Sequence, residues 1–129
     1  MSQPARSVAV IGASSDRRKF GNKAVRAFAA QGWLVYPVNP TEKVVEGLPA
    51  HTSVASVPRP LDAVTMYVPH TIGVALLPEI AAASPGEVWV NPGAGSPELQ
   101  AEAARLKLPA NFACSIVAIG RSPHEFPDA

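Results

Sequence analysis

The stretch that decides the fold is Ser7-Val8-Ala9-Val10-Ile11-Gly12-Ala13-Ser14-Ser15, near the amino terminus. Its first part is short, apolar and β-branched, and it ends at Gly12, which is typical of a buried strand. Residues 12–21 are polar and basic and end at Gly21, so they predict a loop. Asn22 is a plausible N-cap for a helix that ends near Gly32. The chain therefore opens with the strand, loop and helix of an α/β protein.

Strands and helices alternate outward from this unit. Further strands are expected over residues 33–38, 63–68, 87–90 and 112–119. Further helices are expected over residues 71–83, despite Gly73 and Pro78, and from Ser96 as N-cap to about Lys107. Pro37 lacks a backbone donor, so we expect the end of the second strand to lie at an edge of pairing or to leave the sheet already. This order predicts a single domain over residues 1–129. Its fold class is α/β and Rossmann-like, with three layers: an open, mostly parallel sheet of about five strands and helices on both faces.

Length and composition exclude several classes of protein. The 129 residues are 47% hydrophobic and 16% charged, as in an ordinary globular domain. One cysteine, Cys114, excludes an internal disulfide and a cysteine-based metal cluster. No apolar run approaches the roughly 18 residues that span a bilayer, and no signal peptide is visible. We expect a cytoplasmic protein that does not associate with membranes.

Positive charge is concentrated in the first fifth of the chain. Residues 1–26 carry a net charge of +5, and the remainder carries −4. Such an asymmetry would attract an anionic ligand or partner, although a solvated helix face explains it equally well. Nucleic acid is not expected as a partner, because the basic stretch is short, aromatic residues make up 6% and no DNA- or RNA-binding motif is present.

The loops that follow the predicted strands are the candidate binding segments, since open parallel sheets bind ligands beyond the carboxyl ends of their strands. Four such loops read Gly12-Ala13-Ser14-Ser15, Val38-Asn39-Pro40, Val68-Pro69-His70 and Asn91-Pro92-Gly93-Ala94-Gly95. The first is the best phosphate candidate. It combines a glycine turn, two hydroxyl donors, a following helix N-terminus and the charges of Arg17, Arg18 and Lys19. Its glycines do not match the G-x-G-x-x-G fingerprint, so a plain strand-to-helix turn remains the alternative.

The residues at the end of the second strand indicate which nucleotide would bind. NAD-binding domains generally place a carboxylate there for the ribose hydroxyls. This chain has Asn39-Pro40, and no carboxylate lies between Asp16 and Glu42. NAD is therefore disfavoured. A ligand with a phosphorylated ribose, NADP or coenzyme A (CoA), would suit the basic cluster and Lys43.

Several segments together resemble a known family. They are Val8 to Ser14, Gly32 to Val35 with Tyr36-Pro37-Val38-Asn39-Pro40, Glu46 to Pro49, Leu61 to Val64 ahead of Tyr67-Val68-Pro69, Glu87 to Ala94, and the late Cys114. The chain resembles, over about residues 6–121, the small CoA-binding domain family, which is related to the amino-terminal domain of the succinyl-CoA synthetase alpha subunit. The Pro-Val-Asn-Pro and Trp-x-x-Pro-Gly segments are the more specific ones. The chain departs from the family where Thr41-Glu42-Lys43 replaces a lysine directly after Asn-Pro, and at Asn91, where glutamine is more usual.

The resemblance implies CoA in the crevice over the strand ends. The pyrophosphate would contact residues 12–19, the adenosine end would lie near residues 38–43 and 67–69, and the pantetheine arm would point toward residues 92–94. The implied contact residues are Gly12, Ala13, Ser14, Ser15, Arg17, Arg18, Lys19, Val38, Asn39, Pro40, Lys43, Tyr67, Val68, Pro69, Pro92, Gly93 and Ala94.

The sequence offers no catalytic constellation. His51, His70 and His124 lack the spacing of a metal site, and no serine lies in a nucleophile elbow. Cys114 lies in an apolar context typical of an inert thiol, the alternative being a thiol near the CoA sulfur. We therefore expect binding of CoA or an acyl-CoA without catalysis. The alternatives are a small NADP-dependent reductase and a regulatory or interaction subunit with a vestigial pocket, and a protein partner is possible.

Overall fold

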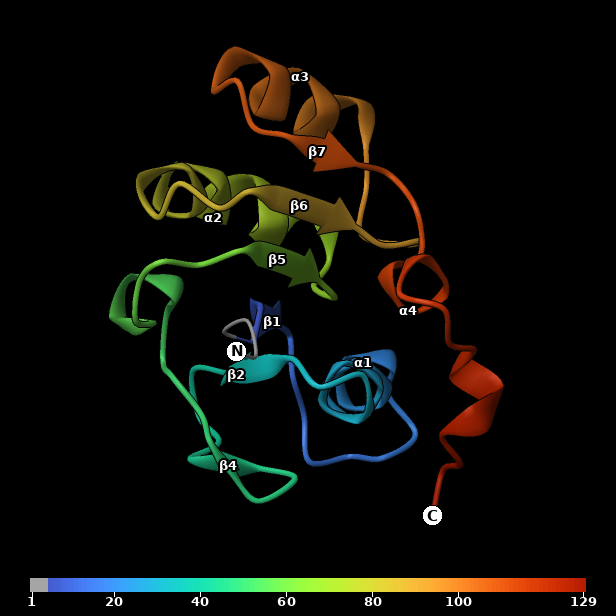
Figure 1. The fold of residues 1–129 in the computed structure, drawn as a ribbon. Helices are drawn as coiled ribbons and strands as arrows, with labels where there is room; N and C mark the ends of the chain where they lie inside the picture. Colours follow the sequence, from blue (N-terminus) through green and yellow to red (C-terminus); the bar gives the residue numbers. More distant parts are fainter. Residues whose placement is uncertain (1–4) are drawn as a thin grey trace.

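The computed structural model describes residues 5–129 and contains a five-stranded parallel sheet in the order β2-β1-β5-β6-β7 (Figure 1). The strands of this sheet are β1 (Ser7–Ile11), β2 (Leu34–Val38), β5 (Ala63–Met66), β6 (Glu87–Val90) and β7 (Ala110–Asn111). The helices are α1 (Phe20–Ala30), α2 (His70–Ala82), α3 (Pro97–Arg105) and α4 (Ser115–Ala118), with 3₁₀ turns η1 (Val54–Ser56) and η2 (Pro123–Glu125). A small antiparallel hairpin joins β3 (Val44–Val45) to β4 (Leu48–Pro49). The Rossmann-like α/β fold class is confirmed.

The two faces of β1 explain the three layers. Val8 and Val10 point to the core under α1 and α4, whereas Ala9 and Ile11 point to the core under α2 and α3. All four side chains are at most 2% exposed. A strand that is apolar on both faces must be covered on both, which is why β1 reads as one continuous apolar run rather than an alternating one. The helices lie accordingly on opposite sides of the sheet (Figure 1).

The strand order locates the ligand crevice. Counted along the chain, the five strands lie in the order 2-1-3-4-5, so the direction of winding reverses between β1 and β5. In doubly wound sheets ligands bind at this reversal, outside the carboxyl ends of the strands. The loops that begin at Gly12 and Tyr67 leave the sheet at this point.

The prediction that Pro37 lies at an edge of pairing is confirmed. β2 is the edge strand of the sheet, and its outer side is covered by an extended segment around His51 rather than by a full strand. The His51 N–H donates to the Pro37 carbonyl (2.8 Å), and the Asn39 N–H donates to the His51 carbonyl (2.9 Å). The proline therefore leaves no gap in the main ladder, because only an edge strand can omit a donor without cost.

The expected strand over residues 112–119 is wrong. The fifth strand is the two-residue β7, and residues 115–118 form α4 instead. The reason lies in tertiary contacts. The Ser115 N–H donates to Asn91 Oδ1 (2.9 Å), and Ser115 and Ile116 are buried while Val117 is 60% exposed. An apolar run of this length does not distinguish strand from helix, and the buried hydrogen bonds select the helix.

Two helix predictions have different outcomes. The helix around residues 71–83 is confirmed as α2, with Gly73 buried where a side chain would press on Met66 and Leu99. The Asn22 N-cap is wrong, because α1 begins at Phe20 with Lys19 at the N-cap. Asn22 is instead fully buried inside the first turn, and its side chain donates to the Ser14 carbonyl (2.8 Å).

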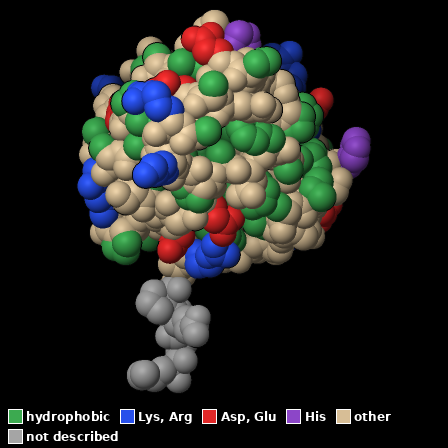
Figure 2. All heavy atoms as spheres, turned by 90° about the horizontal axis from the view of Figure 1, so that it is seen from above, with side chains coloured by type: hydrophobic (Ala, Val, Ile, Leu, Met, Phe, Trp, Pro, Cys, Tyr) green, Lys and Arg blue, Asp and Glu red, His purple; other side chains and the backbone are tan. Residues whose placement is uncertain are grey.

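The surface over α3 carries both signs of charge. In the view from above, Lys and Arg side chains are interspersed with Asp and Glu side chains and hydrophobic groups, with no single charged patch (Figure 2).

Within residues 5–129, none of the helices has the length and apolar character needed to cross a membrane.

Candidate functional site

A pocket of about 960 Å³ opens at the carboxyl ends of β1, β2, β5 and β6. Its volume lies near the upper end of the roughly 300–1,000 Å³ of small-molecule sites. It is lined by Gly12, Ala13, Ser14, Lys19, Phe20, Gly21, Asn39, Thr41, Glu42, Tyr67, Val68, Pro69, His70, Asn91, Pro92, Gly93, Ala94 and Cys114. All four loops singled out in the sequence contribute to this lining, as the topology of a parallel sheet requires.

Most of the predicted contact residues meet in this pocket, but six of them, three of which are basic, do not. The loop residues that line it are Gly12, Ala13, Ser14, Lys19, Asn39, Tyr67, Val68, Pro69, Pro92, Gly93 and Ala94. The lining does not include Ser15, Arg17, Arg18, Val38, Pro40 or Lys43. The predicted contacts did not include Phe20, Gly21, Thr41, Glu42, His70 or Asn91, and Cys114 was only an alternative neighbour of the CoA sulfur. His70 and Asn91 belong to loops already singled out in the sequence, and Thr41 and Glu42 directly follow a third.

The loop after β1 is built by two close backbone approaches. Gly12 has a φ of +87°, and a β-carbon there would lie 2.5 Å from the Tyr67 carbonyl oxygen. A β-carbon on Gly21 would overlap the Gly12 carbonyl oxygen. Only glycine fits at either position, so the first turn of α1, the loop after β1 and the loop after β5 are packed backbone against backbone. This packing presents main-chain groups, rather than side chains, at one wall of the pocket.

The amino terminus of α1 faces this wall. Lys19 is its N-cap residue, and no side chain within the described part of the chain caps its first turn. No acidic residue lies in that turn either. Uncapped N–H groups and the helix dipole favour an anion, and the Lys19 ammonium adds a full positive charge beside them.

A carboxylate already occupies part of this region. Glu42 accepts hydrogen bonds from the Ser15 N–H (3.0 and 3.2 Å to its two oxygens), from the Ser15 hydroxyl and from Asn39 Nδ2 (3.1 Å). The hydrogen bonds from the Ser15 hydroxyl and the Ser15 N–H hold the pKa of the Glu42 carboxyl below its ordinary value, and the charge of Lys19 acts in the same direction. The pocket thus contains one cation and one anion side by side.

Arg17 and Arg18 direct their guanidinium groups to carboxylates. Arg18 Nη2 lies 2.9 Å from Asp16 Oδ2. The hydrogen bonds that the Arg18 side chain and N–H donate to Asp16 lower the pKa of Asp16 to about 2. Arg17 Nη2 lies 3.3 Å from Glu46 Oε1, on the β3–β4 turn. The predicted role of these arginines in contacting phosphate stays a prediction, which a binding experiment can decide.

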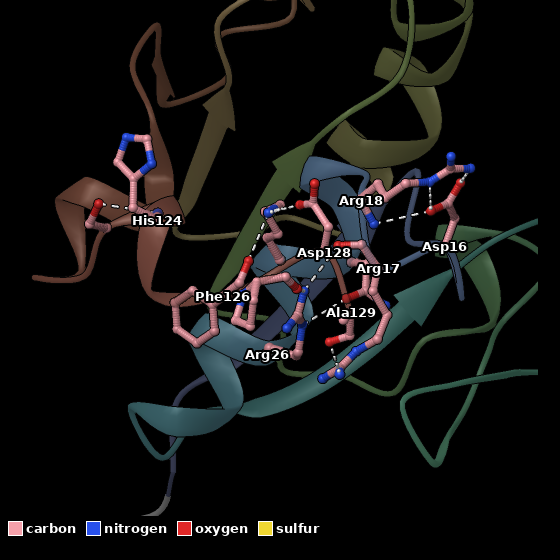
Figure 3. Close-up of polar contacts among 12 residues, drawn as sticks. Asp16, Arg17, Arg18, Arg26, His124, Phe126, Asp128 and Ala129 are labelled. Atoms are coloured by element: carbon pink, nitrogen blue, oxygen red, sulfur yellow. Dashed lines mark hydrogen bonds and ion pairs between the residues drawn. The ribbon is translucent and has the colours of Figure 1, made fainter.

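The other basic side chains of α1 hold the end of the chain. Residues 126–129, which we call the tail segment, lie across α1 (Figure 3). Lys23 Nζ donates to the Phe126 carbonyl and to Asp128 Oδ1, both at 2.7 Å. Arg26 donates to the Pro127 carbonyl (2.9 Å), and Arg17 donates to the Ala129 carbonyl (2.6 Å). The basic side chains of α1 are therefore held by hydrogen bonds to the tail segment.

The floor of the pocket is a buried hydrogen-bond network. Asn91 Nδ2 donates to Thr65 Oγ1 (2.7 Å) and to the Met66 carbonyl (2.8 Å), while the Thr65 and Ser115 hydroxyls are 2.7 Å apart. The Tyr67 hydroxyl lies 3.1 Å from Ser115 Oγ, and burial raises the pKa of Tyr67 to about 12. The network joins β5, β6 and the start of α4. Burial keeps the tyrosine protonated near neutral pH, so the network supports the walls rather than supplying a base.

Two side chains with possible chemistry lie at the pocket, His70 and Cys114. Within residues 5–129 neither side chain forms a hydrogen bond to another titratable group, and no group of three or more potential metal ligands occurs. A nucleophile needs an adjacent base, and that pairing is not formed here.

Comparison with known proteins finds similarity both to much longer proteins and to a protein of about the length of this chain. The alpha subunit of an ADP-forming acetate–CoA ligase II from Pyrococcus furiosus is 42% identical over 65 residues, which is 50% of this chain and 14% of that protein. The present chain thus matches a small fraction of the length of this curated relative. A conserved hypothetical protein of Pyrococcus furiosus superimposes with a TM-score of 0.81 and 29% identity, covering 88% of this chain and 98% of that one. An acetyl-coenzyme A synthetase from Ca. Korarchaeum cryptofilum, solved with phosphate and ADP, superimposes with a TM-score of 0.72 and 26% identity, covering 83% of this chain and 25% of that one.

The family itself is shown by a match along nearly the whole chain. The model of the CoA binding domain matches residues 6–125, which include every loop of the pocket. The resemblance noted in the sequence is thereby confirmed. The chain belongs to the CoA binding domain family.

Proposed function

We propose that this chain is a single CoA-binding domain that holds CoA, or an acyl-CoA, in the pocket over the carboxyl ends of β1, β2, β5 and β6. The observation that carries the proposal is the backbone-lined wall at Gly12 and Gly21 beside Lys19, in a chain whose family is defined by CoA binding. The chain would bind and orient the cofactor, and we propose no reaction of its own.

The donors of the pocket fit the anionic part of CoA. The pyrophosphate would lie against the loop after β1, where uncapped N–H groups of α1 and the Lys19 ammonium meet. Each charge-assisted hydrogen bond to such a group contributes roughly 1.5–3 kcal/mol. Glycine at positions 12 and 21 lets the loops after β1 and β5 and the first turn of α1 pack backbone against backbone, which brings main-chain groups to the wall where the phosphate would lie.

The remaining loops fit the less polar parts of CoA. The adenosine end would lie between Asn39 and the segment Tyr67 to Pro69, and the pantetheine arm would run toward Pro92 to Ala94. Cys114 lines the same pocket, so the thiol end of CoA would approach it there. When bound, CoA supplies a thiol that carries acyl groups, and the described residues would supply only its position.

A protein partner forms part of the proposal. The curated relative is an alpha subunit of a ligase, and this chain matches 14% of its length. If the ligand is presented to an active site, that site would lie on another domain or protein.

Isothermal titration tests the proposed function. CoA, NADP and NAD are titrated separately into the full chain at one ionic strength. We expect saturable heat with CoA and weaker binding of the two dinucleotides. Absence of heat with CoA, or tighter binding of NADP, removes the proposal, and the second result supports the small reductase alternative.

A further inference from the structure

The carboxylate of Glu42 lies where an anionic ligand of the first loop would lie. It accepts from the Ser15 N–H and hydroxyl and from Asn39 Nδ2, and Glu42 itself lines the pocket. The Asn39 side chain also donates to the Ala13 carbonyl (2.8 Å), so it links Glu42 to the loop after β1. Three donors converging on one carboxylate make this a built site for an anion rather than a chance surface contact.

A phosphate and Glu42 cannot use these donors at the same time. A main-chain N–H carries one hydrogen, and the Ser15 hydroxyl donates one more. The same electrostatic features that favour phosphate there, the α1 terminus and Lys19, also favour the carboxylate. A ligand phosphate that reaches Ser15 must therefore displace Glu42, and one that stops short of it must bear the repulsion of an adjacent negative charge.

The backbone at Glu42 allows displacement by side-chain rotation alone. Asn39 Oδ1 accepts from the N–H groups of Thr41 (2.8 Å) and Glu42 (2.9 Å), which fixes the turn after β2. The Glu42 side chain is only half-buried, with its carboxylate held by the first loop and not by a core contact. The turn can keep its conformation while the side chain moves to solvent.

We propose that Glu42 is a built-in competitor for the phosphate of the ligand: it occupies the donors of the loop after β1 in the free protein and sets the affinity for CoA. This inference rests on the proposed function for the identity of the ligand.

Three variants and one titration separate competition from simple repulsion. E42Q keeps the size and an acceptor but removes the charge. E42D keeps the charge on a side chain one methylene shorter, which draws it back from Ser15. E98Q removes a carboxylate from the exposed first turn of α3, away from these donors, and serves as the control for net charge. The dissociation constant for CoA is measured by isothermal titration for each variant and for the wild type.

We expect E42Q to bind CoA about tenfold more tightly than the wild type, E42D to bind more tightly as well, and E98Q to match the wild type. If E42D and the wild type bind equally while E42Q binds more tightly, Glu42 acts by charge alone and the competition is refuted. If E42Q binds CoA more weakly, Glu42 is a ligand contact and the inference is overturned. The inference is also overturned if E42Q loses binding of NAD that the wild type shows, because a carboxylate that contacts the ribose hydroxyls would explain that loss.

A second probe keeps this test separate from that of the proposed function. Inorganic pyrophosphate is titrated into the ligand-free wild type and E42Q, and the amide signal of Ser15 is followed by NMR. We expect this signal to shift at lower pyrophosphate concentration in E42Q. If CoA fails to bind any variant while this difference is seen, the proposed function falls and the competitor role of Glu42 stands. Equal titrations in both proteins refute the competitor role, even where CoA binds.

Discussion

The loop after β1 and the outer face of α1 are neighbours in the sequence, and both are rich in donors, yet they are used differently. At the loop, main-chain N–H groups and Lys19 face an open pocket, and Glu42 is the one carboxylate of the described lining. On the outer face, Lys23 and Arg26 are covered by the tail segment, residues 126–129, through carbonyl groups and Asp128. The first region is accessible to a small molecule, and the second is satisfied by the chain.

Clustered charge in a sequence therefore does not by itself mark a site. Lys23 is only 11% exposed in its side chain and forms two hydrogen bonds of 2.7 Å, so it serves the packing of the tail segment. Lys19, four residues earlier, lies at the other end of the same helical turn and lines the pocket. One helical turn separates a structural cation from a candidate ligand contact.

Gly21→Ala should disturb both regions and have the largest effect. Its new β-carbon would overlap the Gly12 carbonyl oxygen, which is backbone and cannot rotate away, so α1 must shift from the loop. We expect the free energy of unfolding, measured in urea, to fall by about 3 kcal/mol.

Gly95→Ala is the matched control for this substitution. A β-carbon there would lie 3.5 Å from Val90, an ordinary contact, so the loss should stay below about 0.5 kcal/mol. Equal stability of the two variants would show that the contact between Gly12 and Gly21 is not essential to the fold.

Phe126→Ala should separate the two regions. Phe126 is 8% exposed, and the guanidinium groups of Arg26 and Arg121 lie 5.8 and 5.3 Å from its ring centre. Loss of the buried ring and of these cation–π contacts should lower the free energy of unfolding by about 2 kcal/mol. Because the tail segment does not line the pocket, the dissociation constant for CoA should not change.

The control for the tail is Phe112→Ala, since Phe112 is 45% exposed and should cost less than about 1 kcal/mol. A loss of CoA binding in the Phe126 variant, at a temperature where it remains folded, would contradict the separation of the two regions.

Local patterns predicted the fold well where one segment contained the whole signal. The continuous apolar run before Gly12 predicts a strand buried on both faces, and Ser96 with Pro97 predicts the start of α3, where the Ser96 hydroxyl accepts from the Leu99 N–H (3.1 Å). The start of α1 was not predictable in this way. Lys19 is an unusual N-cap residue, and Asn22, the better candidate by type, is buried by its bonds to the first loop and to Glu46 (3.0 Å).

The pocket was predictable in its outline but not in its charges. Because parallel strands end at one edge, the loops after them could be grouped from the sequence alone. The partners of the charged residues could not, since Glu42 lies 27 positions from Ser15 and the tail segment over 100 positions from Lys23. Side-chain direction at such separations depends on the completed fold. No carboxylate directly follows β2 in the sequence, but the turn brings Glu42 to the pocket, and the expectation that NAD is disfavoured stays a prediction.

Lys19→Ala should reduce ligand binding more than Arg18→Ala. Lys19 lines the pocket, whereas Arg18 is bound to Asp16 and 74% exposed. We expect Lys19→Ala to raise the dissociation constant for CoA about tenfold, equivalent to about 1.4 kcal/mol. Arg18→Ala, which removes the same charge one residue away, should have a much smaller effect in the same isothermal titration.

The ribose phosphate offers a second reading of these variants. If Arg18→Ala weakens CoA as strongly as Lys19→Ala but leaves dephospho-CoA unaffected, Arg18 contacts the ribose phosphate rather than the pyrophosphate. In that case the ion pair between Arg18 and Asp16 must open on binding, and Lys19 would not differ from Arg18 in its effect on the dissociation constant for CoA.

Acidification should loosen the tail segment with the smallest effect of the four. Its hydrogen bond to Lys23 holds the pKa of Asp128 below the ordinary value of about 3.9. The stabilisation is therefore complete above that ordinary pKa and is lost as the pH falls through the lower, folded value. The melting temperature of the wild type should exceed that of Asp128→Asn by a constant margin near neutral pH, and the margin should vanish in acid. The ring signals of Phe126, followed by NMR over the same range, should shift in the wild type and stay in place in the variant. Equal melting temperatures of the two proteins near neutral pH would mean that the carbonyl groups, rather than the carboxylate of Asp128, hold the tail segment on α1.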